Sequence, residues 1–343
     1  MQDKSKLDPE TTRFLARAFS KKEEVALSTS LQAERKISRQ AANSFLQRLV
    51  DKGWLIEGSG RRPKTYKQGL IHFSSKTFAL KELEEHVVWE EYVRPYFSDI
   101  VNAESLNIWH YGVTEIVNNA IDHSEGSHIT LWIRVFATFA TIVIQDNGEG
   151  IFRRIARLCK LPDQRQAILE LAKGKLTTDP IRHSGEGIFF SSRAFDRFQI
   201  ISSGLFFDHG EEEQDILYEL DTNDTGTRVI MRHFHEQNRT LKSIFDQFAA
   251  PDEYTFNKTV IPVRLAKMSN EGLMSRSQAQ RLLARIDRFE TVIFDFREVE
   301  TIGQAFADEI FRVFQKTHSN IKIVDENTNS QIKAMISRAK SYI

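Results

Sequence analysis

Hydrophobic and polar residues alternate along this chain with two different periods, one typical of helices and one of strands. At the N-terminus, residues 9–19, 26–33 and 38–50 carry apolar positions at helical spacing. Ser38 is placed to cap the third of these helices, and Gly53 to end it. Residues 54–57 and 65–67 predict two strands joined by a turn at 58–63. This part of the chain therefore reads as helices followed by a hairpin.

The middle of the chain reads as a sheet interrupted by helices. Strands are expected at 70–73, 127–135, 139–145, 198–203, 215–220 and 227–233, with helices at 80–92 and 105–119. Residues 151–183 look charged and weakly structured, apart from a helical piece at 164–171. The acidic run 208–215 is expected to be a solvated loop.

The last hundred residues alternate strands with helices. The strands are expected at 260–265, 292–296 and 321–324, and the helices at 275–288, 304–316 and 330–341. Such alternation favours βαβ units and a parallel sheet. We therefore expect an α/β multidomain protein divided into residues 1–68, 69–238 and 239–343.

Composition is that of a soluble globular protein, with 41% hydrophobic and 27% charged residues among 343. A chain of this length favours two or three domains. No apolar run is long enough to span a membrane, and no secretion signal is evident, so we expect a cytoplasmic protein. The single cysteine, Cys159, excludes an internal disulfide and fits a reducing compartment. No ligand spacing suggests zinc.

Charge is distributed unevenly although the formal net charge is zero. Residues 1–68 contain 15 Lys and Arg but 8 Asp and Glu, so the remainder of the chain is acidic. A basic module on an acidic protein points to nucleic acid.

Three short segments carry the candidate chemistry. Glu115 and Asn119 lie four residues apart on a predicted helix and therefore share one face. A carboxylate can orient a water molecule, and an amide oxygen is a hard magnesium ligand. Asp146-Asn-Gly-Glu-Gly150 and Ser184-Gly-Glu-Gly187 would allow close backbone approach to a nucleotide.

In this order the segments resemble the GHKL (Bergerat-fold) ATPases, which include gyrase, heat-shock chaperones, sensor histidine kinases and mismatch-repair ATPases. EIVNNAIDHS resembles their N box, DNGEGI their first glycine box and HSGEGIFFSSRAFD their second. The resemblance covers about residues 70–235. It implies an α/β sandwich, in which a mixed sheet is backed by helices, and it implies ATP and magnesium as ligands.

The resemblance also implies residue roles. Glu115 would act as the catalytic base, Asn119 would hold magnesium, and Asp146 would accept a hydrogen bond from the adenine amino group. The remaining implied nucleotide-site residues are Asp122, Gly148, Gly150, Ile151, Ser184, Gly185 and Gly187. The segment 151–183 corresponds to the lid that orders on ATP binding. No Walker-type lysine loop is present, and Lys175, Arg182 and His183 are candidates to meet phosphate charge.

The N-terminal helices and hairpin resemble a winged helix-turn-helix domain that binds duplex DNA. The residues expected at the DNA are Ser38, Arg39, Gln40, Asn43 and Ser44 in the major groove, and Arg61, Arg62 and Lys64 at phosphate or the minor groove. Winged helices also serve as protein-docking or dimerisation modules, which is the alternative. A homodimer is expected from both resemblances.

The segment FDFREVETIGQAFADEIF resembles STAS and STAS-like domains, such as the anti-sigma-factor antagonists that partner GHKL kinases. There the loop before the helix holds a serine that becomes phosphorylated. Here the loop reads Ile302-Gly-Gln-Ala305 and has no hydroxyl group. A docking or transducing role toward a protein partner is therefore expected.

These features favour a regulatory protein in which a slow GHKL-type ATPase controls a DNA-binding module. The alternative is an anti-sigma-type serine/threonine kinase, for which Glu115 would serve equally well. A third hypothesis treats the nucleotide as a structural ligand. Histidine autophosphorylation fits poorly, because no dimerisation helix with a His-Glu pair is evident.

Overall fold

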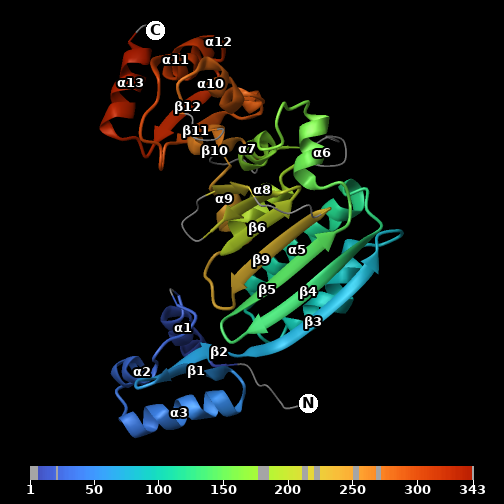
Figure 1. Ribbon diagram of the computed structural model, residues 1–343, viewed down its shortest axis with the longest axis vertical. Helices are drawn as coiled ribbons and strands as arrows, with labels where there is room; N and C mark the ends of the chain where they lie inside the picture. Colours follow the sequence, from blue (N-terminus) through green and yellow to red (C-terminus); the bar gives the residue numbers. More distant parts are fainter. Residues whose placement is uncertain are drawn as a thin grey trace.

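The computed structural model describes residues 7–20, 22–176, 185–210, 215–219, 225–249, 255–267 and 272–341. These residues form a mixed α/β protein with sheets of two, seven and three strands. Figure 1 places the N-terminal unit at one end of the large sheet and the C-terminal unit at the other. The expected α/β class is confirmed.

The N-terminal unit contains the predicted helices and hairpin. Its elements are α1 (Pro9–Ala18), α2 (Ser28–Arg35), α3 (Arg39–Asp51), β1 (Leu55–Arg61) and β2 (Lys64–Gln68). Ser38 caps α3 as expected, because its hydroxyl oxygen accepts the N–H of Ala41. Strand β1 extends through the predicted turn 58–63 to Arg61, so the turn is shorter than expected. A hydrophobic cluster of its own, with Leu15, Leu46 and Trp54, fills this unit.

The chain passes from the N-terminal unit into the large sheet through Gly69. A Cβ atom at this position would lie 2.0 Å from the carbonyl oxygen of Gly53, so only glycine fits. Beside it, Gln68 Oε1 accepts hydrogen bonds from the N–H of Thr138 at 3.1 Å and its hydroxyl at 2.8 Å. The hairpin is thereby attached to a turn of the sheet.

The central unit is built on seven strands in the order β3-β4-β5-β9-β6-β7-β8, all antiparallel to their neighbours. They are β3 (Leu70–Ala79), β4 (His128–Phe136), β5 (Phe139–Asp146), β6 (Arg197–Ser202), β7 (Leu205–His209), β8 (Asp215–Glu219) and β9 (Thr227–Phe234). The helices are α4 (Glu85–Val87), α5 (Ala103–His123), α6 (Ile151–Leu158), α7 (Gln166–Lys173), α8 (Gly187–Ala194) and α9 (Leu241–Asp246). In Figure 1, α5 lies behind the sheet.

The long helix α5 carries the apolar stripe that packs against the sheet. Asn102 caps it by accepting the N–H of Ser105 at 2.7 Å. Trp109 is fully buried, and its ring lies 4.9 Å from that of Phe195 at the end of α8. Because the apolar stripe packs against the strands, the direction of the opposite, polar face of α5 is fixed.

Four expectations for this unit are corrected. The sheet was expected to be mixed, but all its neighbouring strands are antiparallel. The helix predicted at 80–92 begins at Glu85 and continues to residue 96. The acidic run does not begin as a solvated loop, because Asp208 is buried in β7 and bonds Arg197 at 2.7 Å. Within residues 151–176, the described part of the segment expected to be weakly structured, α6 and α7 occupy most positions, and α7 is buried from Ala167 to Lys173.

The C-terminal unit is a parallel three-stranded sheet with helices, as the alternation predicted. It contains β10 (Lys258–Pro262), α10 (Arg276–Leu283), β11 (Thr291–Asp295), α11 (Gln304–Asp308), α12 (Gln315–Thr317), β12 (Lys322–Glu326) and α13 (Ser330–Lys340). The strand order is β10-β11-β12. Its hydrophobic core is continuous with that of the central unit.

We expect Gly69→Ala to destabilise the junction between the hairpin and the large sheet by roughly 2–3 kcal/mol, because the added methyl group meets backbone. Native-state hydrogen exchange at the amides of β1 and β2 measures this. Gly210→Ala is the control, since a Cβ there has nothing within 4 Å. Equal exchange protection in the two variants would contradict the prediction.

Candidate functional site

A cavity of about 330 Å³ opens between α5, the end of β5, and helices α6, α7 and α8. This volume is within the range of small-ligand sites. Its walls include Glu115, Asn118, Asn119, His123, Ser124, Ile144, Asp146, Ile151, Arg154, Leu171, Leu176, Gly185, Gly187, Thr227 and Val229. Polar groups from several elements thus converge on a cavity with apolar walls.

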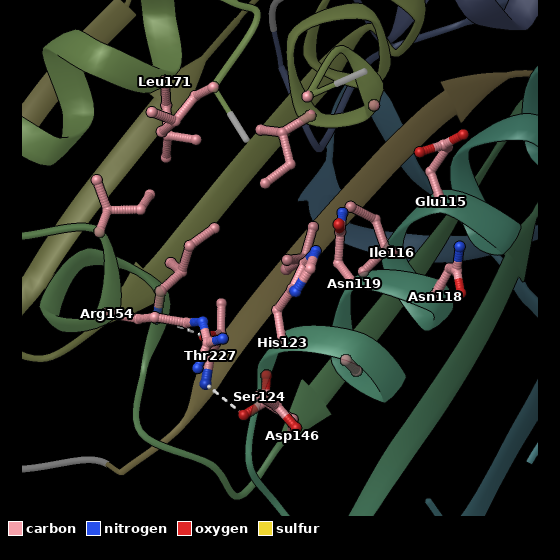
Figure 2. Close-up of a pocket in the computed structure, with 18 of the residues that line it drawn as sticks. Glu115, Ile116, Asn118, Asn119, His123, Ser124, Asp146, Arg154, Leu171 and Thr227 are labelled. Atoms are coloured by element: carbon pink, nitrogen blue, oxygen red, sulfur yellow. Dashed lines mark hydrogen bonds between the residues drawn. The ribbon is translucent and has the colours of Figure 1, made fainter. Parts of the chain in front are cut away.

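Helix α5 supplies one polar wall. Glu115, Asn119 and His123 follow one another at four-residue spacing, and Figure 2 shows them along the same side of the helix. The Nδ2 atom of Asn119 is buried and has no hydrogen-bond partner among the described residues. A buried amide group without a partner costs free energy unless a ligand satisfies it.

Glu115 lies directly against the first residue of α8. A Cβ atom at Gly187 would come within 2.0 Å of Glu115 Oε2, so a larger residue at this position would displace the Glu115 carboxylate. Burial raises the pKa of the nearby Tyr111, and the negative charges of Glu115 and Glu186 raise it further. Two carboxylates therefore make this end of the cavity negative, which favours a bound cation.

Asp146 forms the other polar end of the cavity, at the last position of β5. Its side chain is buried, and Oδ1 accepts the N–H groups of Gly148 at 2.8 Å and Thr227 at 3.2 Å. Burial raises the pKa of this carboxyl group although both hydrogen bonds oppose the rise. The side chain is thus held rigidly at the cavity wall.

Most of the implied nucleotide-site residues are brought together. Those lining the cavity are Glu115, Asn119, Asp146, Ile151, Gly185 and Gly187. Gly148 and Gly150 shape the turn between β5 and α6 instead of lining the cavity. Asp122 is exposed and outside the lining set, while Arg182, His183 and Ser184 lie outside the described residues.

Residues 278–333 match the family model described as a STAS-like domain of unknown function (DUF4325). The C-terminal part of the chain contains a STAS-like domain. A STAS-like domain suggests interaction with proteins. The chain matches no curated protein. No helix in the described ranges is long and apolar enough to cross a membrane.

Several cavity residues escaped the sequence analysis. Arg154 on α6 lines the cavity and forms an ion pair with Glu125 at 2.5 Å. Thr227 bridges two segments, because its N–H bonds Asp146 and its hydroxyl accepts the N–H of Ile151 at 2.9 Å. The one available signal for Thr227 was its position directly after Gly226 at the start of a predicted strand.

The residues expected to contact DNA lie on α3 and at the hairpin tip. Arg39, Gln40, Ser44, Arg61 and Arg62 are exposed. Two others are exposed and partnered: Asn43 accepts the Ser28 hydroxyl at 2.7 Å, and Lys64 pairs with Glu57 at 2.5 Å. Ser38 caps α3, so its hydroxyl oxygen is already engaged.

Asp146→Asn should remove a pH-dependent loss of stability. The folded-state pKa of Asp146 is raised. Its contribution to the free energy of unfolding is therefore fully present below the ordinary pKa of 3.8 and is lost as pH rises through the folded-state pKa. The asparagine Oδ1 can still accept both backbone N–H groups. Urea unfolding of both proteins between pH 3.5 and 7 should show that the variant gains stability relative to the wild type as pH rises. A difference independent of pH would contradict this.

Proposed function

We propose that the protein is a nucleotide-controlled regulator whose central domain is a GHKL ATPase. The observation that carries this is the meeting of Glu115, Asn119 and Asp146 in one cavity with the N-terminus of α8. A buried carboxylate at one end suits the adenine amino group. Backbone N–H groups at a helix N-terminus suit phosphate at the other.

The residues present fit a magnesium ion bound together with the nucleotide phosphates. The described residues hold no group of three or more His, Cys, Asp or Glu side chains that could bind a metal by themselves. Magnesium typically uses one or two protein ligands and substrate phosphates. The amide group of Asn119, whose Nδ2 atom bonds none of the described residues, can present its oxygen to the ion after rotation, and the ion would neutralise phosphate charge.

Glu115 is the residue placed to activate a nucleophile. Its carboxylate contacts the first turn of α8, where the terminal phosphate would lie if the base contacts Asp146. There it can accept a proton from water as that water attacks phosphorus. A serine hydroxyl of a partner protein could occupy the same place, so anti-sigma-type kinase activity is the alternative.

Glu115→Gln should lower phosphate release from ATP at least about 100-fold, the usual scale for a general base, while ATP affinity is kept. Glu104→Gln is the matched control, because Glu104 is exposed in the first turn of the same helix. Calorimetry with Mg·ATP measures binding, and radiolabelled γ-phosphate reports the product. Free phosphate supports an ATPase, label on a protein supports the kinase, and no binding heat rejects both.

We further propose that the N-terminal unit is a winged helix that binds duplex DNA. Its exposed basic side chains on α3 and the hairpin tip, and the positive charge of residues 1–68, support this. The Gln68–Thr138 contact joins the unit to the nucleotide-binding sheet. Nucleotide occupancy would influence DNA binding only if the two domain arrangements bind nucleotide differently. The STAS-like domain is proposed to contact a protein partner.

Replacing Arg39, Arg61 and Arg62 with alanine should weaken binding to a mixed-sequence duplex and reduce the slope of log affinity against log salt by up to about 3. Each lost phosphate contact removes a share of counterion release. The charge-matched control replaces the exposed Lys322, Lys333 and Arg338 of the STAS-like domain. Equal affinities and salt slopes for both triple variants would contradict DNA binding through this surface.

A further inference from the structure

Helix α7 is buried on all sides, although it is short and carries charge. From Ala167 to Lys173 every residue is buried, including Glu170 at 5% and Lys173 at 2% exposure. One side of the helix faces the cavity, where Leu171 forms part of the wall. Another side packs against β10 of the C-terminal unit. The helix is therefore a partition between the cavity and the STAS-like domain.

Lys173 is the centre of the contacts across this partition. Its ammonium group bonds Glu170 at 2.9 Å, and it donates to the carbonyl oxygens of Arg281 at 2.7 Å and Ala284 at 2.9 Å. These carbonyls belong to the C-terminal end of α10, where helix oxygens lack intrahelical partners and favour a cation. Arg285 then pairs with the second oxygen of Glu170 at 2.8 Å.

The last residue of α7 and the two residues that follow it are held by the same domain. The Thr259 hydroxyl of β10 donates to the carbonyl oxygen of Lys173 at 2.7 Å. Arg288 Nη1 donates to the carbonyl oxygen of Lys175 at 2.7 Å, and Lys175 Nζ donates to that of Arg288 at 3.1 Å. Both backbone and side-chain atoms of residues 173–175 thus form hydrogen bonds with the C-terminal unit.

On the cavity side, the residue after this group contacts the glycine segment 185–187. Leu176 lines the cavity, and its N–H donates to the carbonyl oxygen of Gly185 at 3.1 Å. A Cβ atom at Gly185 would lie 2.4 Å from the carbonyl carbon of Leu176, so the two backbones are in close contact. A displacement of residues 173–176 would therefore move Gly185, and with it the wall that continues to Gly187.

We propose that the STAS-like domain sets the shape of the nucleotide cavity by holding α7, with Lys173 as the positioning residue. Lys173 is not among the cavity-lining residues and acts through Leu171, Leu176 and Gly185. This inference rests on the proposed nucleotide site. Coupling is reciprocal by thermodynamic necessity: a change in the STAS-like domain alters nucleotide affinity, and nucleotide binding alters the end of α10.

The test uses Arg288→Ala and Thr259→Val in the full-length chain. Arg288 is exposed, so its truncation leaves the core intact, and the valine keeps the size of the buried threonine. Each variant should bind a non-hydrolysable ATP analogue with magnesium about fivefold more weakly, the lower end of common inter-site coupling. Arg276→Ala is the matched control, because Arg276 is exposed at the start of α10, remote from these contacts.

Hydrogen exchange supplies a readout that a purely structural role of these side chains would not change. In the wild type, the nucleotide analogue should slow amide exchange at residues 281–288 more than in α13 of the same domain. Exchange in α13 serves as the reference, because it reports the general stabilisation by a bound ligand. Both variants should lose this difference. Wild-type binding without the difference, or unchanged affinity in both variants, overturns the coupling alone. Absence of nucleotide binding in the wild type overturns the proposed function and the coupling together.

Discussion

The buried carboxylate of Asp146 is the constraint on which the central domain depends. It forms no ion pair among the described residues, so backbone N–H groups must satisfy it. One donor, Gly148, belongs to the turn after β5, and the other, Thr227, begins β9. The Asp146 side chain thereby bonds both the start of β9, which pairs with β5, and the turn that leads into α6. Helix α6 begins directly after this turn and, together with α5, α7 and α8, supplies walls of the cavity.

Local periodicity was enough to predict most elements. The N-terminal helices, the hairpins and the parallel C-terminal sheet follow from apolar spacing and turn residues. The four-residue spacing of Glu115 and Asn119 likewise predicted that both lie on one face of α5, and Asp146 lies at the strand end as predicted; all three line the cavity. These features need no knowledge of distant segments, because a helix face and a strand end are local properties.

What the sequence could not reveal depends on partners far along the chain. Helix α7 looked like part of a surface excursion because Glu170 and Lys173 are charged, and their burial requires Arg285 and the end of α10. Strand β7 was missed because Asp208 suggested a loop, whereas Arg197 of the neighbouring strand pairs with it. Arg154 and Thr227 likewise reach the cavity only through tertiary contacts.

The two outer units are attached to the central domain in different ways, and this difference bears on regulation. The N-terminal unit has a hydrophobic cluster separate from the main core, and Ile71 of β3 and Ala137 between β4 and β5 belong to this cluster, beside the Gln68–Thr138 hydrogen bonds. The STAS-like domain shares a continuous core with the central domain. Separating two units costs free energy in proportion to the apolar surface exposed, so the continuous core shared with the STAS-like domain resists separation more than the small N-terminal junction does. Under the proposed coupling, a signal received by the STAS-like domain would therefore be transmitted by an adjustment at α7, where charged groups are bonded within the shared core.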